Sequence, residues 1–222
     1  MIHWNENNGW MEFPHLSLNT GLTRTYTLAY KLTDRNSETW STRFSRFKDK
    51  DQKAYFGGAR LFYEAFPPLF NSLNLAPANC VFLAALSSSE TSADRSRQIP
   101  YIAAELASLI GAHDGIDALS KQVHESIHNR YSAGARDAEL EKANYVCGKL
   151  PAKNVFVFDD FVTRGGTLSK VAQAVHAANS GSKVYGVALA KTERVNWCRN
   201  PENDHVPARW AKVWTDGENE VA

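Results

Sequence analysis

Two segments of the chain follow the same order: a short apolar run, a polar loop and an amphipathic helix. In the first segment, VFLAAL (81–86) precedes SSSETSADRSR, and apolar residues then recur at helical spacing up to Gly111. In the second, VFVF (155–158) precedes DDFVTRGG and a helical stripe, and a strand at 183–190 follows. Buried strands that alternate with helices are typical of a parallel sheet with helices on both faces, so we predict an α/β fold. The residues that mark the two helices are Ile99, Ile102, Ala103, Leu106 and Ile110, and then Leu168, Val171, Ala172 and Val175.

The flanking segments are less regular. Residues 25–32 (TYTLAYKL) have the alternation of a strand, and an apolar stripe over 52–66 predicts a helix that Pro67 and Pro68 bring to an end. Residues 1–24 show weak periodicity, so we expect an irregular lobe or cover there. The polar stretch 120–142 fits a mobile loop over a site and a solvated surface helix equally well.

Composition narrows the class of protein. The 222 residues are 43% hydrophobic, and 25 Lys and Arg against 24 Asp and Glu give a net charge of +1. This balance lacks the broad basic field of nonspecific nucleic-acid binders, so direct nucleic-acid binding is not expected. No apolar run approaches the roughly 20 residues of a membrane span, and no signal peptide is evident, which predicts a cytoplasmic protein.

The rarer residue types carry no clear site. Three separated cysteines predict reduced thiols rather than disulfides or a zinc site. His113 is interpreted as part of a turn, because no second ligand cluster accompanies it. For the six tryptophans, packing between the terminal segments is favoured over stacking on a base. The cysteines are Cys80, Cys147 and Cys198, and the tryptophans are Trp4, Trp10, Trp40, Trp197, Trp210 and Trp214.

The stretch VFVFDDFVTRGGTL (155–168) carries the most chemistry. Asp159 and Asp160 follow the apolar strand, at the sheet edge where open α/β folds bind ligands. Thr163, Arg164, Gly165, Gly166 and Thr167 then lead into a helix. Glycines that turn backbone N–H groups toward one point, a helix amino end and threonine hydroxyls together favour a phosphate. Carboxylates beside such a cradle need another partner in the ligand, either a metal or a pair of hydroxyls, and a sugar phosphate fits this arrangement.

The pattern D-D-x-x-T-x-G-G-T resembles the phosphoribosyl pyrophosphate (PRPP) motif of type I phosphoribosyltransferases. The order of the surrounding segments resembles the ComF/GntX-like branch of that family, without its amino-terminal four-cysteine zinc module. The similarity spans roughly residues 25–195. The segments concerned are TYTLAYKL, RFKDKDQKAYF, VFLAALSSSE with the Arg-containing loop and helix after it, and KVYGVALAKT.

The resemblance implies a type I phosphoribosyltransferase-like parallel sheet flanked by helices, with a small cover (hood) region. It implies one domain over 1–222, with a core at about 52–190 and a cover from 1–51, to which 191–222 could be added. It also implies transfer of the phosphoribosyl group from PRPP with Mg²⁺ to an unidentified nitrogen acceptor, with release of pyrophosphate. Mg²⁺ is expected mainly on the oxygens of PRPP, so no protein metal ligand is assigned. Members of the family are often homodimers, which we expect here too.

The resemblance assigns roles residue by residue. Asp159 and Asp160 become the catalytic carboxylates at the ribose hydroxyls, and Thr163 to Thr167 become the 5′-phosphate site. Ser87, Ser88 and Ser89, with Glu90 after them, stand in the place of the pyrophosphate loop. Further candidate contacts to the leaving group are Arg95, Arg97, Lys121 and Arg130, for each of which a solvated surface charge is an alternative.

Other interpretations remain open on the sequence alone. The aspartate pair could be a turn or helix cap, or could belong to a phosphate-ester hydrolase or a phosphoacceptor domain. These alternatives leave the double-glycine turn unexplained. A noncatalytic regulator or DNA-uptake accessory protein of the ComF type, which binds PRPP or a nucleotide as a signal, is the main rival function.

Overall fold

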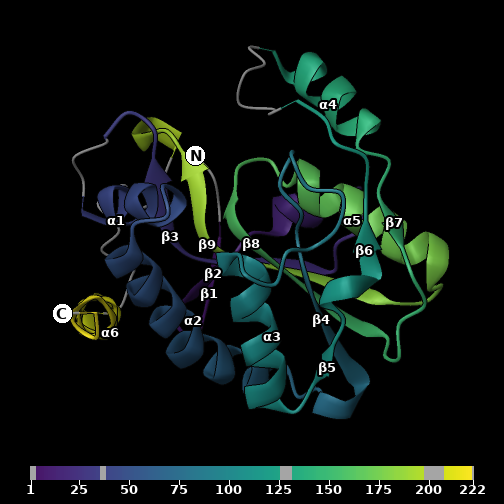
Figure 1. The fold of residues 1–222 in the computed structure, drawn as a ribbon. Helices are drawn as coiled ribbons and strands as arrows, with labels where there is room; N and C mark the ends of the chain where they lie inside the picture. The colour runs from purple at the N-terminus through teal and green to yellow at the C-terminus, as the bar shows by residue number, and fades with distance from the viewer. Residues whose placement is uncertain (1–3, 36–38, 126–131, 198–207, 222) are drawn as a thin grey trace.

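The centre of the molecule is a mostly parallel seven-stranded sheet flanked by helices (Figure 1). The computed structural model describes residues 4–35, 39–125, 132–197 and 208–221. The strand order is β1-β2-β3-β9-β8-β4-β5. The last five strands of this order, β3, β9, β8, β4 and β5, run parallel, and β1 and β2 add an antiparallel edge. The strands are β1 Asn5–Asn7, β2 Trp10–Glu12, β3 Arg24–Leu32, β4 Cys80–Ala84, β5 His113–Asp114, β8 Asn154–Val162 and β9 Lys183–Glu193. The prediction of an α/β fold is confirmed.

Alternate residues of the central strands face two separate cores. Phe82 and Phe156 point to a face covered by α1 Thr39–Lys48, α2 Gln52–Ser72, α3 Gln98–Ile110 and α6 Ala208–Asn219. Val81 and Val155 point to the other face, where α5 Gly166–Ala178 packs. Because both faces are buried, the strands read in the sequence as continuous apolar runs.

The expected strand–loop–helix units are confirmed, with small shifts at their ends. Gly111 ends α3 in the left-handed conformation, with φ of 79°. The second strand is longer than predicted, because β8 continues through Asp159 and Asp160 to Val162. The prediction that the aspartates belong to the loop was therefore wrong, and only 163–165 connect β8 to α5.

The prediction that Pro67 and Pro68 end the helix at 52–66 was also wrong. Helix α2 continues through both prolines to Ser72. Each proline removes one helical hydrogen bond. Beyond them, Leu69 and Phe70 are buried in the same core as Phe66, and their burial offsets that loss.

The expected irregularity of residues 1–24 holds only in part. β1 and β2 form strands, and β2 pairs with β3 to extend the main sheet. In the stretch 120–142, residues 133–142 form helix α4 Ala133–Lys142, whereas 126–131 lie outside the described residues. A separate two-stranded sheet joins β6 Leu119–Ser120 to β7 Val146–Cys147.

The rare residues mostly serve packing. Cys80 and Cys147 are free and buried, as predicted, and Cys198 lies outside the described residues. Trp40 and Trp214 meet edge to face at 6.0 Å, which confirms the packing interpretation for this pair from opposite ends of the chain. Trp197 differs, since it is exposed.

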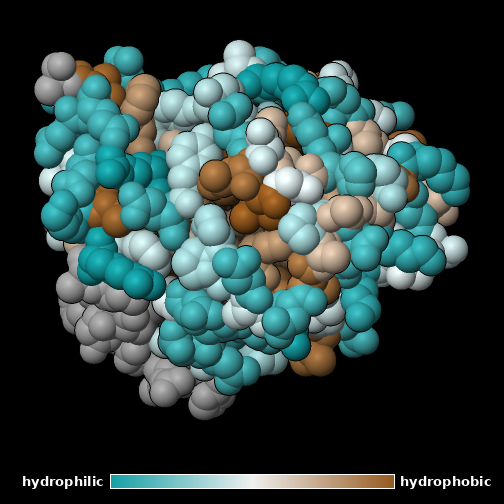
Figure 2. Space-filling model, turned by 90° about the horizontal axis from the view of Figure 1, so that it is seen from below, coloured by the Kyte–Doolittle hydropathy of each residue, from teal (hydrophilic) through white to brown (hydrophobic). Residues whose placement is uncertain are grey.

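The molecular surface seen from below is mostly hydrophilic, with hydrophobic residues gathered near its centre (Figure 2). Within the described ranges, no helix has both the length and the apolar character needed to cross a membrane.

Helix α6 approaches α2 through a glycine. A Cβ added at Gly217 would lie 2.6 Å from the carbonyl oxygen of Phe56 and 2.9 Å from the Cα of Gly57. We expect Gly217→Ala to destabilise the protein by about 1–3 kcal/mol, because backbone atoms have to separate. The matched control is Gly134→Ala in α4, where nothing lies within 4 Å of the added Cβ, and it should stabilise by about 0.5–1 kcal/mol. Urea unfolding measures both, and equal effects would contradict the close approach of the two helices.

Candidate functional site

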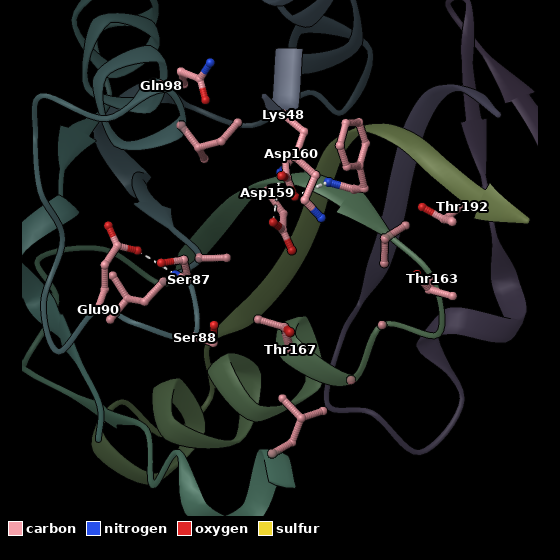
Figure 3. A pocket seen from close by; sticks show the side chains of 18 of the residues that line it. Lys48, Ser87, Ser88, Glu90, Gln98, Asp159, Asp160, Thr163, Thr167 and Thr192 are labelled. Carbon is pink, nitrogen blue, oxygen red and sulfur yellow. Dashed lines mark hydrogen bonds between the residues drawn. The ribbon is translucent and has the colours of Figure 1, made fainter. Parts of the chain in front are cut away.

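A pocket of about 480 Å³ opens at the carboxyl ends of the central strands (Figure 3). Its walls come from the loop after β4, the end of β8 with the start of α5, and the connection between α1 and α2. The carboxyl edge of a parallel sheet is the usual ligand site of open α/β folds. The lining residues used below are Lys48, Lys50, Ser87, Ser88, Glu90, Arg97, Leu140, Tyr145, Asp159, Asp160 and 163–167.

The aspartate pair lies at the centre of this pocket (Figure 3). The pairing of β8 with β9 joins Asp159 to Ala188 and Phe161 to Ala190 but skips Asp160. At this point each carboxylate accepts a hydrogen bond from the next backbone N–H: Asp160 N donates to Asp159 Oδ1 at 2.8 Å, and Phe161 N donates to Asp160 Oδ1 at 2.7 Å. The side chains are thereby fixed at the pocket wall.

Burial and the neighbouring carboxylate both act on Asp159. Removal from water, and then the negative charge of Asp160 beside it, raise the pKa of Asp159 well above its ordinary value. The smaller, opposite effects come from the N–H of Asp160 and the charge of Lys48. Carboxyl groups in this arrangement are suited to bind hydroxyl donors or a cation.

The predicted phosphate cradle forms the adjoining wall. Gly165 caps α5 in the left-handed conformation with φ of 74°, which a side chain would strain. The first N–H groups of a helix have no partner within the helix, so the start of α5 presents donors and a partial positive charge. Thr163 and Arg164 are exposed, while Gly166 and Thr167 are partly buried.

Helix α4 covers the start of α5. A Cβ added at Gly166 would lie 2.7 Å from Leu140 Cδ1, so the second glycine lets the two helices meet. Leu140 is buried and lines the pocket. Sequence reasoning missed this residue, because the weakly periodic stretch around it gave no reason to place it at the site.

The loop of residues 87–90, called the serine loop below, lies across the pocket from the cradle formed by residues 163–167. Ser87 and Ser88 line the pocket, but Ser89 does not; its hydroxyl lies 3.3 Å from that of Ser87. Glu90 joins the lining, and its carboxylate accepts the N–H of Ser87 at 2.6 Å. Two of the three predicted serines therefore lie at the pocket, together with the carboxylate of Glu90, and Ser89 lies outside its lining.

The four basic residues predicted to contact the leaving group lie in different places. Arg97 lines the pocket, with Nη1 at 2.7 Å from both Ser87 Oγ and Glu90 Oε1. The guanidinium of Arg95 instead pairs with Asp114 and Asp117 on the surface. Lys121 is buried, and its Nζ donates to the carbonyl of Ser88 at 3.0 Å, so it positions the loop from behind. Arg130 lies outside the described residues.

The α1–α2 connection adds two lysines that sequence reasoning did not select. Lys48 and Lys50 line the pocket, and the Nζ atoms of Lys31 and Lys48 each lie 5.8 Å from the ring centroid of Phe161. Tyr145 also lines the pocket, and its hydroxyl donates to the carbonyl of Leu86 at 3.2 Å. The sequence KDK (48–50) reads as an ordinary solvated turn, so no local signal marks these residues.

The fold and the site define an α/β protein with a pocket at the carboxyl edge of a mostly parallel sheet, lined by carboxylates, lysines and arginines. Neither the protein-family models nor the curated proteins contain a match to this chain. Within the described ranges, no group of three or more His, Cys, Asp or Glu side chains could hold a metal ion by itself.

Proposed function

We propose that this protein binds Mg²⁺–PRPP and transfers its phosphoribosyl group to a nitrogen nucleophile, as a type I phosphoribosyltransferase. The observation that carries the proposal is that Asp159, Asp160 and the cradle 163–167 line the same pocket, with Ser87 and Ser88 on its other side. The parallel sheet is compatible with the fold that the motif resembles.

The three parts of PRPP match three parts of the pocket. In the proposal, the 5′-phosphate binds at the start of α5, where backbone N–H groups and the Thr163 and Thr167 hydroxyls gather. The ribose hydroxyls donate to Asp159 and Asp160. The diphosphate lies toward the serine loop, where Arg97 supplies positive charge.

This placement suits a displacement at ribose C1. As the bond to pyrophosphate breaks, the ring gains positive charge, which the carboxylates of Asp159 and Asp160 stabilise. Donors on the departing pyrophosphate stabilise its charge, and one such preorganised donor contributes about 3 kcal/mol. No covalent protein nucleophile is required.

Mg²⁺ fits this donor set as a partner of the ligand. Because Mg²⁺ gives up its water reluctantly, it typically binds one or two carboxylates together with substrate phosphates. The pocket offers the pair Asp159 and Asp160 and no larger set of ligands among the described residues. In the proposal the ion lowers the charge of the diphosphate and is held mainly by PRPP oxygens.

Calorimetric titration of Mg²⁺–PRPP into the protein, followed by a pyrophosphate-release screen over nucleobases and amines, tests the proposal. We expect micromolar binding and release with at least one acceptor. Binding without release, with ligand-dependent association of a partner, would favour the noncatalytic regulator. Phosphate release without any acceptor would favour an ester hydrolase, and no binding at millimolar ligand would refute the proposal.

Gly165 gives a test of the cradle with a matched control. Gly165→Ala places a side chain at φ of 74°, and Gly111→Ala does so at φ of 79° at the end of α3, away from the pocket lining. Both should lose about 1–2 kcal/mol of stability, because L residues are strained in this conformation.

Only Gly165→Ala should weaken PRPP binding, because it shifts the N–H groups that start α5. Calorimetry at matched fractions of folded protein makes the comparison. If the Kd of Gly165→Ala equals that of Gly111→Ala, the 5′-phosphate does not bind at this turn.

A further inference from the structure

The carboxylate of Glu90 lies within the loop where the proposed function places pyrophosphate (Figure 3). Glu90 Oε2 accepts the N–H of Ser87 at 2.6 Å, and Oε1 lies 2.7 Å from Arg97 Nη1. The side chain is only 12% exposed, and Oε1 has almost no contact with solvent. Glu90 therefore engages a backbone donor and a guanidinium, the two kinds of group that bind phosphate oxygens.

The surroundings are arranged for an anion. Arg97 Nη1 donates a hydrogen bond to Ser87 Oγ at 2.7 Å and forms the ion pair with Glu90, so the guanidinium contacts both the loop and the carboxylate. Behind the loop, Lys121 Nζ donates to the carbonyls of Ser88 and Gln122. Burial lowers the pKa of Lys121, and the negative charge of Glu90 opposes that change, which places this ammonium within electrostatic reach of the carboxylate.

A purely structural role accounts for part of this arrangement. Residues 87–90 form a turn, in which Glu90 N donates to Ser87 O at 3.1 Å, and the side chain closes the turn by accepting Ser87 N–H. A carboxylate that only closed a turn would keep its hydration by facing solvent. Glu90 instead faces the pocket and pairs with Arg97.

We propose that Glu90 is an internal competitor of the diphosphate: it holds the donors of the serine loop in the ligand-free protein and leaves them when a diphosphate binds. The identity of the ligand rests on the proposed function. A ligand whose single phosphate binds at the start of α5 leaves Glu90 in place. Glu90 thereby makes the pocket discriminate between a sugar monophosphate and a sugar diphosphate.

The substitution Glu90→Gln distinguishes competition of Glu90 with the diphosphate from a purely structural role in the turn 87–90. Gln keeps the size and one oxygen acceptor for Ser87 N–H, but removes the negative charge. Competition therefore predicts that inorganic pyrophosphate binds Glu90→Gln at least about tenfold more tightly than wild type, because a neutral amide binds Arg97 and the Ser87 N–H less strongly than a carboxylate and is displaced more easily. Ribose 5-phosphate, which lacks the diphosphate, should bind both proteins equally.

The measurement is calorimetric titration of Mg²⁺–pyrophosphate in the presence of saturating ribose 5-phosphate, which keeps pyrophosphate out of the cradle at α5. The matched control is Glu64→Gln on α2, which removes an exposed carboxylate paired with Arg60 and should leave both affinities unchanged. Thermal unfolding of each variant shows that the proteins compared are folded.

The outcomes separate the two proposals. Weaker or unchanged pyrophosphate binding in Glu90→Gln overturns the competitor role, and if ribose 5-phosphate still binds, the sugar-phosphate site survives. Pyrophosphate binding gained only in the variant supports the competitor role even where wild type binds none. If neither protein binds pyrophosphate, ribose 5-phosphate or PRPP, both proposals fail.

Discussion

The variant Asp159→Asn/Asp160→Asn is expected to bind Mg²⁺–PRPP at least about a hundredfold more weakly than wild type. A hydrogen bond to a charged group contributes about 1.5–3 kcal/mol, and the variant replaces two carboxylates by neutral amides of the same shape. Transfer should fall further than binding, because an amide does not stabilise positive charge on the ribose ring.

Calorimetry and pyrophosphate release measure the two losses, and Asp216→Asn is the matched control. Asp216 pairs with Lys212 on α6 and is not part of the pocket lining, so its replacement should leave both measurements unchanged. Retained turnover in the double variant would remove these carboxylates from the reaction.

The raised pKa of Asp159 should make the native protein less stable as the pH rises. The pKa of Asp159 is raised in the folded state, so the folded protein binds this proton more strongly than the unfolded chain. The stabilisation of the folded state by this bound proton is therefore present at low pH and is lost as the pH rises through the folded-state pKa of Asp159. Asp159→Asn should consequently raise Tm at pH 7, and this gain should shrink as the pH falls toward the ordinary aspartate pKa.

Thermal unfolding of wild type and Asp159→Asn across this pH range makes the comparison. A Tm difference that stays constant with pH would contradict the raised pKa. A variant that is more stable and yet binds no PRPP would show that the carboxylate pair is retained at the expense of folding stability.

Phe66→Ala is expected to cost about 3–5 kcal/mol of folding free energy, the largest effect of a single substitution that we predict for stability. Phe66 is fully buried on α2 and lies between that helix and the sheet. Its ring centroid lies 5.1 Å from that of Phe158, 5.5 Å from Phe82 and 5.7 Å from Phe156. Its removal leaves a cavity that three neighbouring rings on two strands cannot fill by a simple rotation.

Urea unfolding of Phe66→Ala, Phe66→Leu and Leu109→Ala tests this. Phe66→Leu should lose less folding free energy than Phe66→Ala, because the leucine side chain fills part of the space. Leu109 is 60% exposed on α3, so its replacement should change stability by less than about 0.5 kcal/mol. A loss below about 1 kcal/mol for Phe66→Ala would mean that the aromatic core repacks around the gap.

The main elements of the fold could be predicted from the sequence because their signals are local. The runs at 81–86 and 155–158 are apolar because both faces of the sheet are covered, and Gly111 ends its helix because its conformation is one that glycine adopts readily. The motif at 159–167 could be located for the same reason, since the aspartates, the glycines and the helix start are neighbours in the chain.

Arg95 and Arg97 show why other features could not be predicted. They are two residues apart and equally plausible as pocket residues. Arg95 turns to Asp114 and Asp117, whereas Arg97 turns to Glu90. The choice depends on where the chain brings acidic partners, which no short-range pattern encodes.

The sequence by itself determined the alternating α/β order and the position of the candidate ligand motif, because side-chain periodicity and turn chemistry act between residues close in the chain. Only the tertiary structure decided that α2 passes through Pro67 and Pro68, and that β2 joins the sheet beside β3. It also decided that Lys48 and Leu140 reach the pocket. These features depend on contacts between distant segments, where burial and charge pairing outweigh local preference.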